Sequence, residues 1–339
     1  MGLGGDAEIV NYPMKYTKLP FSKMLIHKAW ELFRSFLGAA RKKQKIMTFI
    51  RNKMAVKDEI FDFRDLSEIN KYSKWIVGSD QVWNLNITDD PAFRLELVSP
   101  NQQKYSYAAS FGKDSLNSKE EQLFRESLGD FKSISVREYS GVNIVKKIGY
   151  DAINVLDPTL LLTLSDWQDK LNLANNGQLR KKEYVLCYLL TGNPLNSSII
   201  SCTYNYASKN GIGLYVIGAR ETCILKFWDN IKYINTAGPE DFVELIQNAK
   251  IVFTNSFHGT CFSLIFHKQF ITFLKNGSER NNRLTELLGK LGLSHRIIKD
   301  VEDCSEFNNL RAIDYSIVSP ILEQLRQSSL IYLNSIIHS

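Results

Sequence analysis

The chain has 339 residues, of which 44% are hydrophobic and 23% charged, and its formal net charge is +6. A chain of this length usually forms about two domains, each with a core large enough to fold without metals or disulfides. Because it contains only 19 glycines and 8 prolines, collagen-like, linker-rich and disordered chains are excluded.

No apolar run approaches the roughly 18 residues of a membrane span, and no basic and apolar leader is visible at the N-terminus. The cysteines are scattered and form no C-x-x-C pair, which is typical of reduced thiols rather than a disulfide framework or a zinc site. We therefore predict a cytoplasmic protein. The five cysteines are Cys187, Cys202, Cys223, Cys261 and Cys304.

The positive charge is concentrated in residues 21–57, which hold ten Lys/Arg and a single acid, Glu31. This local excess is larger than the net charge of the whole chain, so the remainder is slightly acidic. Apolar residues at helical spacing predict an amphipathic helix here. Two interpretations stay open: a solvated helix face, or a platform for anionic membrane lipid or acidic glycan. Nucleic acid is not expected, because no nucleic-acid-binding motif accompanies the charge.

From residue 73 onward, strand and helix patterns alternate. The first series ends at an Asp-Pro turn, residues 157–158. Within it, Ser118 and Glu121 have the spacing of a capping box at a helix start. Such alternation is typical of a parallel sheet covered by helices. The predicted strands are 74–78, 104–109, 134–136 and 153–156, and the predicted helices are 118–128 and 140–147.

A second series follows the polar stretch 175–178. We expect strands at 184–190, 214–217, 251–254 and 270–274, and helices at 197–210, 238–249, 260–267 and 318–337. The two series predict an α/β protein with two doubly wound, Rossmann-like domains that face each other across a cleft. We place the first domain at 1–175, the second at 180–315, and a C-terminal helix at 316–339 that packs back on the first domain.

Ligands of open parallel sheets bind beyond the carboxyl ends of the strands, so the polar residues after each strand are the candidates. The strongest signal is the segment 254–260, where a strand delivers polar side chains to the start of a helix. Backbone N–H groups at a helix start favour a phosphate or carboxylate, and a histidine there can donate a proton. The alternative is a helix cap beside an ordinary loop histidine. The candidates are Asn255, Ser256, His258, Gly259 and Thr260.

Two further turns could carry chemistry. Asp80 follows a glycine turn close to Gln81 and Trp83, which suits a carboxylate that orients a sugar hydroxyl beside an aromatic face. A capping aspartate and a core tryptophan are the alternative. Arg137 follows a buried strand, where it can clamp an anion or pair with Glu138.

Several segments, taken in order, resemble the polysaccharide pyruvyl transferase family. Each is loose by itself, but the ordered set over about residues 73–295 is specific. The segments are GSDQVWN (78–84), YAASFG (107–112), ISVREYSG (134–141), VLDPTLLL (155–162), YLLTGN (188–193), AGPEDFVELIQNA (237–249) and TNSFHGTCFSLIF (254–266).

The resemblance implies a glycosyltransferase-B-like fold and transfer of pyruvate from phosphoenolpyruvate to a sugar of a lipid-linked or polymeric glycan. The product would be a pyruvate ketal on a cell-surface or extracellular polysaccharide precursor, made at the inner face of the membrane. A cationic site with a histidine suits an anionic donor and its proton transfers. This chemistry needs no metal or redox cofactor, and phosphoenolpyruvate would be the co-substrate.

By resemblance, His258 maps onto the family's histidine and Arg137 onto its arginine after the strand. We expect His258 to act as general acid and Arg137 to clamp the donor, with Asp80 orienting the acceptor hydroxyl. Some members carry an arginine where this chain has Ser256, so Arg283 or Arg220 would supply that cation. The donor site would be completed by Asn255, Ser256, Gly259 and Thr260, and the acceptor site by Gln81 and Trp83.

Members of the family usually begin with a strand, a loop and a helix before a strand that resembles residues 7–12. In this chain the latter lies near the start, so we expect the first strand–helix unit of the N-terminal domain to be missing. Two other functions stay open. One is a nucleotide-sugar glycosyltransferase of similar fold, and the other is a degenerate member that binds glycan without turnover.

Overall fold

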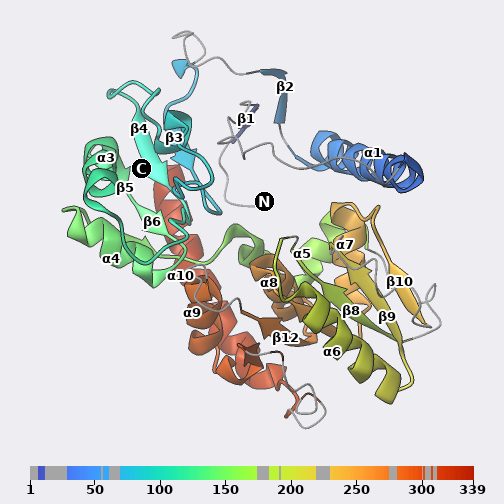
Figure 1. Ribbon diagram of the computed structural model, residues 1–339. Coiled ribbons are helices and arrows are strands. Elements are labelled where there is room, and N and C mark those ends of the chain that lie inside the picture. Colours follow the sequence, from blue (N-terminus) through green and yellow to red (C-terminus); the bar gives the residue numbers. More distant parts are fainter. Residues whose placement is uncertain are drawn as a thin grey trace. The chain divides into compact units, whose positions relative to one another are not determined.

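The computed structural model divides the chain into two compact units, traced in Figure 1. The first unit comprises Met1–Lys23, Ala55–Leu161 and Pro320–Ser339, and the second comprises Met24–Met54 and Leu162–Ser319. The structure describes residues 7–11, 29–54, 56–60, 69–173, 183–190, 192–218, 230–274, 281–299, 301, 307 and 311–339, without the side chains of 10–11, 29–37 and 56–60.

The boundary between the units lies at Leu161 and Leu162, earlier than the expected 175–180. The reason is a short helix that the sequence pattern missed, α5 (Leu164–Leu171), which begins after a capping box at Thr163. Its Trp167 ring packs edge-on against Phe262 of the second unit, with ring centroids 4.9 Å apart. The segment after residue 161 therefore belongs to the second unit.

The first unit contains short strands that all pair in parallel. β3, β4 and β5 form a sheet in that order, and β6 pairs with β7. Isolated parallel bridges from Ala109 to Asp80 and to Val136 connect these groups just beyond the strand ends. The carboxyl ends of β3, β4, β6 and β7 therefore lie on one side. The bounds are β3 (Lys74–Val77), β4 (Gln103–Ser106), β5 (Phe131–Ser133), β6 (Ser135–Val136) and β7 (Ile153–Asn154).

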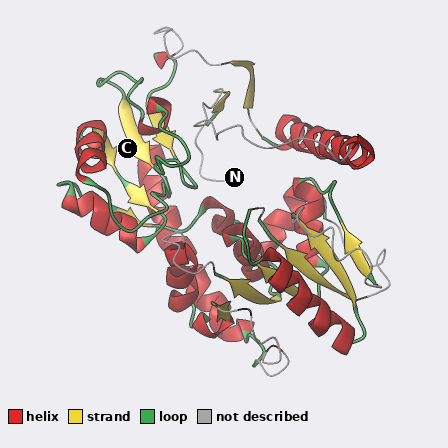
Figure 2. Ribbon diagram, viewed as in Figure 1, coloured by secondary structure: helices red, strands yellow, loops and turns green. Residues whose placement is uncertain are grey.

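Helices α3 (Ser118–Leu128) and α4 (Tyr139–Lys147) follow β4 and β6, close to the predicted ranges. The cap of α3 is Asn117 with Glu120, one residue before the predicted pair. The unit also contains a separate parallel pair, β1 (Ile9–Asn11) with β2 (Val56–Ile60). Figure 2 shows the helices lying around the short strands.

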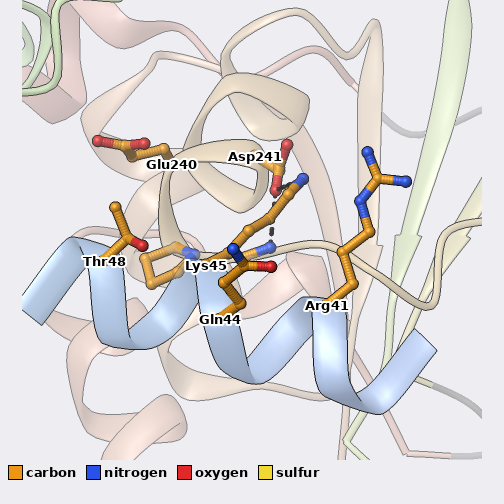
Figure 3. Close-up of a pocket in the computed structure, with 8 residues that line it drawn as sticks. Arg41, Gln44, Lys45, Thr48, Glu240 and Asp241 are labelled. Carbon is orange, nitrogen blue, oxygen red and sulfur yellow. Dashed lines mark hydrogen bonds and ion pairs between the residues drawn. The ribbon is translucent and has the colours of Figure 1, made fainter. Parts of the chain in front are cut away.

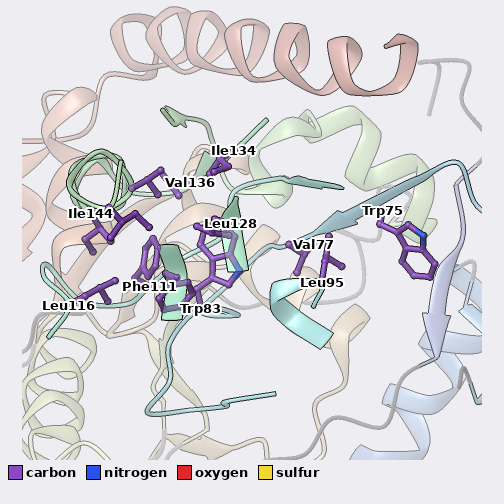
Figure 4. Close-up of a cluster of buried hydrophobic side chains, with 14 of the residues drawn as sticks. Trp75, Val77, Trp83, Leu95, Phe111, Leu116, Leu128, Ile134, Val136 and Ile144 are labelled. Atoms are coloured by element: carbon purple, nitrogen blue, oxygen red, sulfur yellow. The ribbon is translucent and has the colours of Figure 1, made fainter. Parts of the chain in front are cut away.

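The core of the first unit is aromatic (Figure 4). Trp83 lies at its centre and is 1% exposed. Its ring contacts Phe111 and Phe124, with centroid distances of 5.1 and 6.0 Å. Aliphatic side chains from α3, α4 and the strands complete the cluster, including Leu128, Val136 and Ile144.

The C-terminal helix α10 (Tyr315–His338) contains Pro320, and from that residue onward it belongs to the first unit. Tyr332 donates a hydrogen bond to the backbone oxygen of Ser106 over 3.0 Å, and the Ser329 hydroxyl accepts one from the backbone of Leu156 over 2.9 Å. These buried polar contacts fix the helix along the sheet.

The second unit contains a six-stranded parallel sheet in the order β10-β9-β8-β11-β12-β13. The strand order reverses between β8 and β11, as in Rossmann folds, where the crevice at this switch point binds ligands. The two strands pair from Val185 opposite Ile251 to Tyr188 opposite Thr254. The bounds are β8 (Tyr184–Tyr188), β9 (Gly213–Ile217), β10 (Ile231–Tyr233), β11 (Ile251–Thr254), β12 (Gln269–Phe273) and β13 (Ile297–Ile298).

Most helices of the second unit fall where the sequence pattern placed them. The exceptions are α8, which begins three residues earlier than expected, and α5 and α9, for which no range was predicted. Four strands of the two units were missed as well: β2, β5, β10 and β13. The helices are α1 (Ala29–Lys53), α5, α6 (Asn196–Lys209), α7 (Pro239–Gln247), α8 (Phe257–Ile265) and α9 (Asn282–Lys290).

One expectation about the cysteines is wrong. Cys202 is disulfide-bonded, so the thiols are not all reduced. Cys187 lies fully buried in β8, where burial raises the pKa of its thiol to about 12. Such a thiol is a poor nucleophile, as expected for a small core residue. Within the described ranges, no helix combines the length and apolar character needed to cross a membrane.

Candidate functional site

At the switch point of the second unit, the side chain of Asn255, directly after β11, bridges the ends of the two central strands. Its Oδ1 accepts a hydrogen bond from the backbone of Leu190, just after β8, over 2.7 Å. Its Nδ2 donates to Oδ1 of Asn196, at the start of α6, over 3.0 Å. Asn255 thus ties together the two strand ends and the start of α6, and this framework fixes the position of the first turn of α8.

Ser256 is the N-cap of α8. Its hydroxyl accepts a hydrogen bond from the backbone N–H of Gly259 over 3.3 Å, and the side chain is buried. The backbone N–H of Ser256 donates to the Thr254 hydroxyl over 3.0 Å. The structure therefore supports the interpretation of Ser256 as a helix cap.

Gly259 and Thr260 pack α8 onto the sheet. A Cβ on Gly259 would lie 2.5 Å from the hydroxyl oxygen of Thr254, so only glycine fits this close approach. Thr260 is fully buried, and its hydroxyl lies 2.8 Å from that of Thr272 in β12. The expectation that the Thr260 side chain contacts the donor is wrong, because β12 occupies it.

His258 is the second residue of α8 and is half-buried. Its ring lies edge-on to that of Phe257, with centroids 5.5 Å apart. The guanidinium carbon of Arg283 lies 5.4 Å from the centroid of the same Phe257 ring, a cation–π contact that joins α9 to α8. A histidine and an arginine therefore both contact the Phe257 ring at the start of α8, an arrangement that suits an anion and a proton transfer.

On the first unit, Arg137 lies among three carboxylates at the carboxyl ends of three strands. Its Nη1 is 2.8 Å from Oδ2 of Asp157, its Nη2 is 3.0 Å from Oδ1 of Asp80, and its Nε is 3.7 Å from Oε2 of Glu138. Burial by itself lowers the pKa of the guanidinium, but these carboxylates raise the pKa above its ordinary value. Arg137 is therefore firmly cationic and bound to acids, which is the pairing alternative rather than an open anion clamp.

Two of the carboxylates have further partners inside the unit. Asp157 accepts hydrogen bonds from the hydroxyls of Ser79 and Thr159 over 3.1 and 2.8 Å. Glu138 accepts one from the hydroxyl of Ser110 over 2.6 Å. The Asp157-Pro158 pair follows a predicted strand, and the sequence favoured a turn over a catalytic acid there.

Asp80 differs from its neighbours because its side chain is 58% exposed. It follows Gly78, whose φ is +125°, and a Cβ there would lie 2.1 Å from the backbone oxygen of Tyr107. Asp80 itself has a φ of +58°, in the left-handed region. The glycine turn thus presents an acceptor carboxylate to solvent while Arg137 holds it from beneath.

Of the two predicted acceptor residues, Gln81 is partly exposed and Trp83 is buried. Trp83 is a core residue, and its indole N–H donates to the backbone oxygen of Phe93 over 2.9 Å. The expectation that it stacks on a sugar is therefore wrong. Gln81 accepts a hydrogen bond from the Asn84 side chain over 2.7 Å. The exposed aromatic residue on this side is instead Tyr139, which begins α4 two positions after Arg137 and is 56% exposed.

Arg220, the other predicted donor cation, lies outside the described residues. A pocket of about 310 Å³ lies elsewhere in the second unit, between α1 and the start of α7 (Figure 3). In it, Lys45 forms an ion pair with Asp241 over 2.7 Å. Because Arg41 and Glu240 also line it, the charges balance, and we assign no donor site there.

Comparisons with solved structures agree with this architecture. MnaA of S. aureus, solved with UDP, is 9% identical, with a TM-score of 0.50 over 83% of this chain and 80% of that chain. A putative UDP-N-acetylglucosamine 2-epimerase from Listeria monocytogenes is 13% identical, with a TM-score of 0.50 over 84% of this chain and 80% of that chain. At such identities the likeness concerns the fold alone, which is α/β, Rossmann-like and glycosyltransferase-B-like.

No curated protein matches the chain. A family model described as polysaccharide pyruvyl transferase, however, matches residues 2–276, most of its length. This range includes Asp80, Arg137 and His258. The chain belongs to the polysaccharide pyruvyl transferase family.

Proposed function

We propose that the protein transfers pyruvate from phosphoenolpyruvate to a sugar of a lipid-linked or polymeric glycan, forming a pyruvate ketal. The observation that carries this proposal is His258 on the first turn of α8 at the switch point, with Arg283 against the adjacent Phe257. Phosphoenolpyruvate is a small dianionic or trianionic donor, and ketal formation begins with a proton transfer. The site offers a proton carrier, a cation and a helix start together.

The reaction would proceed in two additions. A proton adds to the methylene carbon of phosphoenolpyruvate, which makes the neighbouring carbon electrophilic. One sugar hydroxyl attacks that carbon, the carbon–oxygen bond to phosphate breaks, and a second hydroxyl of the same sugar closes the ketal ring. The two hydroxyl protons balance the proton taken up by carbon and the one that leaves with inorganic phosphate.

We assign His258 the proton delivery to the methylene carbon, since histidine is the side chain most often used for proton transfer in catalysis. The start of α8 and Arg283 stabilise the charge on the departing phosphate. Asn255 and Ser256 would act indirectly, because their side chains build the turn that orients His258. These side-chain roles need neither a metal nor a redox cofactor.

On the first unit we assign Asp80 the orientation of an acceptor hydroxyl. The buried Arg137 would act as its positioning residue, which revises the donor-clamp hypothesis in view of its three carboxylate contacts. Tyr139 replaces Trp83 as the aromatic residue that could pack against the sugar ring. The acceptor we propose is an exopolysaccharide precursor at the cytoplasmic face of the membrane.

A nucleotide-sugar glycosyltransferase is the second candidate. It is favoured by the reversal of strand order between β8 and β11, a crevice that also suits nucleotides, and by the fold shared with MnaA, which was solved with UDP. The donor therefore has to be tested directly, with a UDP-sugar beside phosphoenolpyruvate.

The test incubates the full chain with phosphoenolpyruvate and glycan acceptors, and follows phosphate release and the product mass. We expect phosphate release coupled to a pyruvylated acceptor, and a loss of at least about 100-fold in His258→Ala. His267→Ala is the matched control, since His267 lies just after α8, outside the site, and its ring stacks on Tyr315; it should change the rate by less than about twofold. Turnover of a UDP-sugar without phosphate release from phosphoenolpyruvate would favour the second candidate, and glycan binding without turnover would indicate a degenerate member.

A further inference from the structure

Helix α1 carries the basic segment and is fastened to the second unit along one side. Lys45 pairs with Asp241 at the start of α7 over 2.7 Å, and Lys53 donates to the backbone oxygen of Lys170 over 2.8 Å. Figure 3 shows Lys45 and its neighbours on α1 directed toward the α7 residues. These contacts fix α1 on the second unit. They also determine which side of α1 remains exposed to solvent.

A second face of α1 is exposed and combines cations with apolar side chains. Lys43, Met47 and Arg51 are spaced four residues apart, so they lie above one another on the helix. Met54 follows Met47 by seven residues and keeps a helical hydrogen bond to Ile50. Met47 is 48% exposed and Met54 38% exposed. We name these four residues the Lys43–Met54 face.

This face points away from the α7 contact. Because an α-helix turns about 100° per residue, Lys45 lies about 160° around the axis from Met47. The acidic groups of α7, Glu240 and Asp241, line the pocket on the Lys45 side. Between Gly38 and Met54 the sequence has no acidic residue, so this part of α1 places no carboxylate on the exposed face.

We propose that the Lys43–Met54 face docks on the surface of an anionic phospholipid bilayer. Cationic side chains are attracted to anionic headgroups, and two unbranched apolar side chains between them can enter the boundary of the acyl chains. An acidic glycan would satisfy the cations but would leave both methionines in water. The apolar component therefore favours lipid over glycan, the two partners that the charge alone left open.

The docking would hold the second unit at the surface where a lipid-linked acceptor is embedded. It does not depend on the identity of the donor. Its test can therefore be run without phosphoenolpyruvate or acceptor, and its failure is distinguishable from failure of the proposed transfer reaction.

The experiment is co-sedimentation of the full chain with vesicles of phosphatidylcholine alone or mixed with phosphatidylglycerol. We expect binding to the anionic vesicles only, weakened by high salt. Lys43→Glu/Arg51→Glu should lower the partition at least about tenfold, and Met47→Ser/Met54→Ser about fivefold. The matched control is Lys42→Glu/Lys209→Glu, which makes the same change in net charge at exposed positions off this face and should stay within about twofold.

Circular dichroism and thermal melting verify that each variant is folded, and His258→Ala should bind vesicles like the unmodified chain. Equal losses in the control and in the Lys43/Arg51 variant would overturn the proposal, because net charge rather than position would then govern binding. Absence of binding to anionic vesicles, or capture by an acidic polysaccharide in their place, would overturn it as well. Unchanged binding of the methionine variant would show that Met47 and Met54 do not enter the bilayer, and it would overturn the choice of lipid over glycan.

Discussion

The Nη2 group of Arg137 donates to Oδ1 of Asp80 over 3.0 Å, although the Asp80 side chain is 58% exposed and that of Arg137 only 2%. The pair therefore connects the interior of the first unit with its surface. Asp157 holds the other side of the guanidinium over 2.8 Å, with 2% of its own side chain exposed. A substrate hydroxyl at Asp80 would thus meet a carboxylate whose position is set from within the fold.

Replacing Arg137 with methionine should destabilise the chain by about 3–5 kcal/mol, because Asp157 and Glu138 would remain buried without their cation. The loss should shrink toward acidic pH, where protonated carboxyl groups need no counter-ion. Urea unfolding at pH 7 and pH 5 measures it. Arg125→Met on the exposed side of α3 is the control and should cost less than about 1 kcal/mol. Equal costs at the two positions would contradict the assigned role of the buried cluster.

The same substitution should have opposite effects in two helices of the second unit. Gly259→Ala should destabilise by about 1–3 kcal/mol, because its Cβ would meet the Thr254 hydroxyl and the Tyr188 ring at 2.5 and 2.9 Å. Gly289→Ala in α9 has its nearest atom 3.9 Å away and should stabilise by about 0.5–1 kcal/mol. Thermal melting of both variants gives the two signs, and stabilisation by Gly259→Ala would refute the packing role.

Ser256→Asp separates capping from donor binding. Aspartate caps a helix about as well as serine, so the cap should be retained, and any loss of unfolding free energy would come from burying the new carboxylate. The added carboxylate would repel an anionic donor at the start of α8, and KM for phosphoenolpyruvate should rise at least about tenfold. Ser256→Ala, which removes the cap, should instead cost about 1 kcal/mol. An unchanged KM in Ser256→Asp would argue against phosphate binding at this turn.

Two aromatic residues of the first unit should respond differently. Trp83→Phe should destabilise by about 1–3 kcal/mol without changing KM for the acceptor, because Trp83 lies inside the core. Tyr139→Ala should leave stability within about 0.5 kcal/mol and raise the acceptor KM at least about fivefold, with rescue by Tyr139→Phe. Acceptor titrations and urea unfolding distinguish the two. A higher acceptor KM in Trp83→Phe alone would reverse these assignments.

Glu96 provides a pH-dependent term in stability. Burial by itself raises the pKa of its carboxyl, but hydrogen bonds from Arg94 and Ser127 lower the pKa below its ordinary value overall. A lowered folded-state pKa means that the stabilisation is present above the unfolded pKa and is lost as pH falls through the folded one. Glu96→Gln should therefore be less stable than the unmodified chain at pH 7, and equally stable near pH 2. A difference that persists at the lower pH would show that the charge is not its cause.

The sequence by itself determined most of the local structure. Alternating apolar segments located β3, β8, β11 and β12 to within a residue or two, because a buried strand needs a short apolar run. Helices α3, α4, α6 and α7 were found from their periodicity and polar starts. The missed elements are short or weakly patterned: β13 has two residues, and α5 has eight, of which only Leu171 is buried.

For the candidate site, the sequence identified which side chains are present but not which way each side chain points. The ordered motifs pointed to His258, Asp80 and Arg137 in one family. They could not show that Thr260 faces β12, that Trp83 fills the core, or that Arg137 is surrounded by carboxylates. Those facts depend on which neighbouring strand ends a side chain meets, and such contacts join residues 12 to 57 positions apart.

Charge shows the same division. The sequence alone established that residues 21–57 carry an excess of basic side chains over a slightly acidic remainder. Only the tertiary structure decided which of them are used inside the fold, as Lys45 is with Asp241, and which share an exposed face with Met47 and Met54. The physical reason is that composition sums charges, whereas packing against α7 selects the side of α1 that remains exposed.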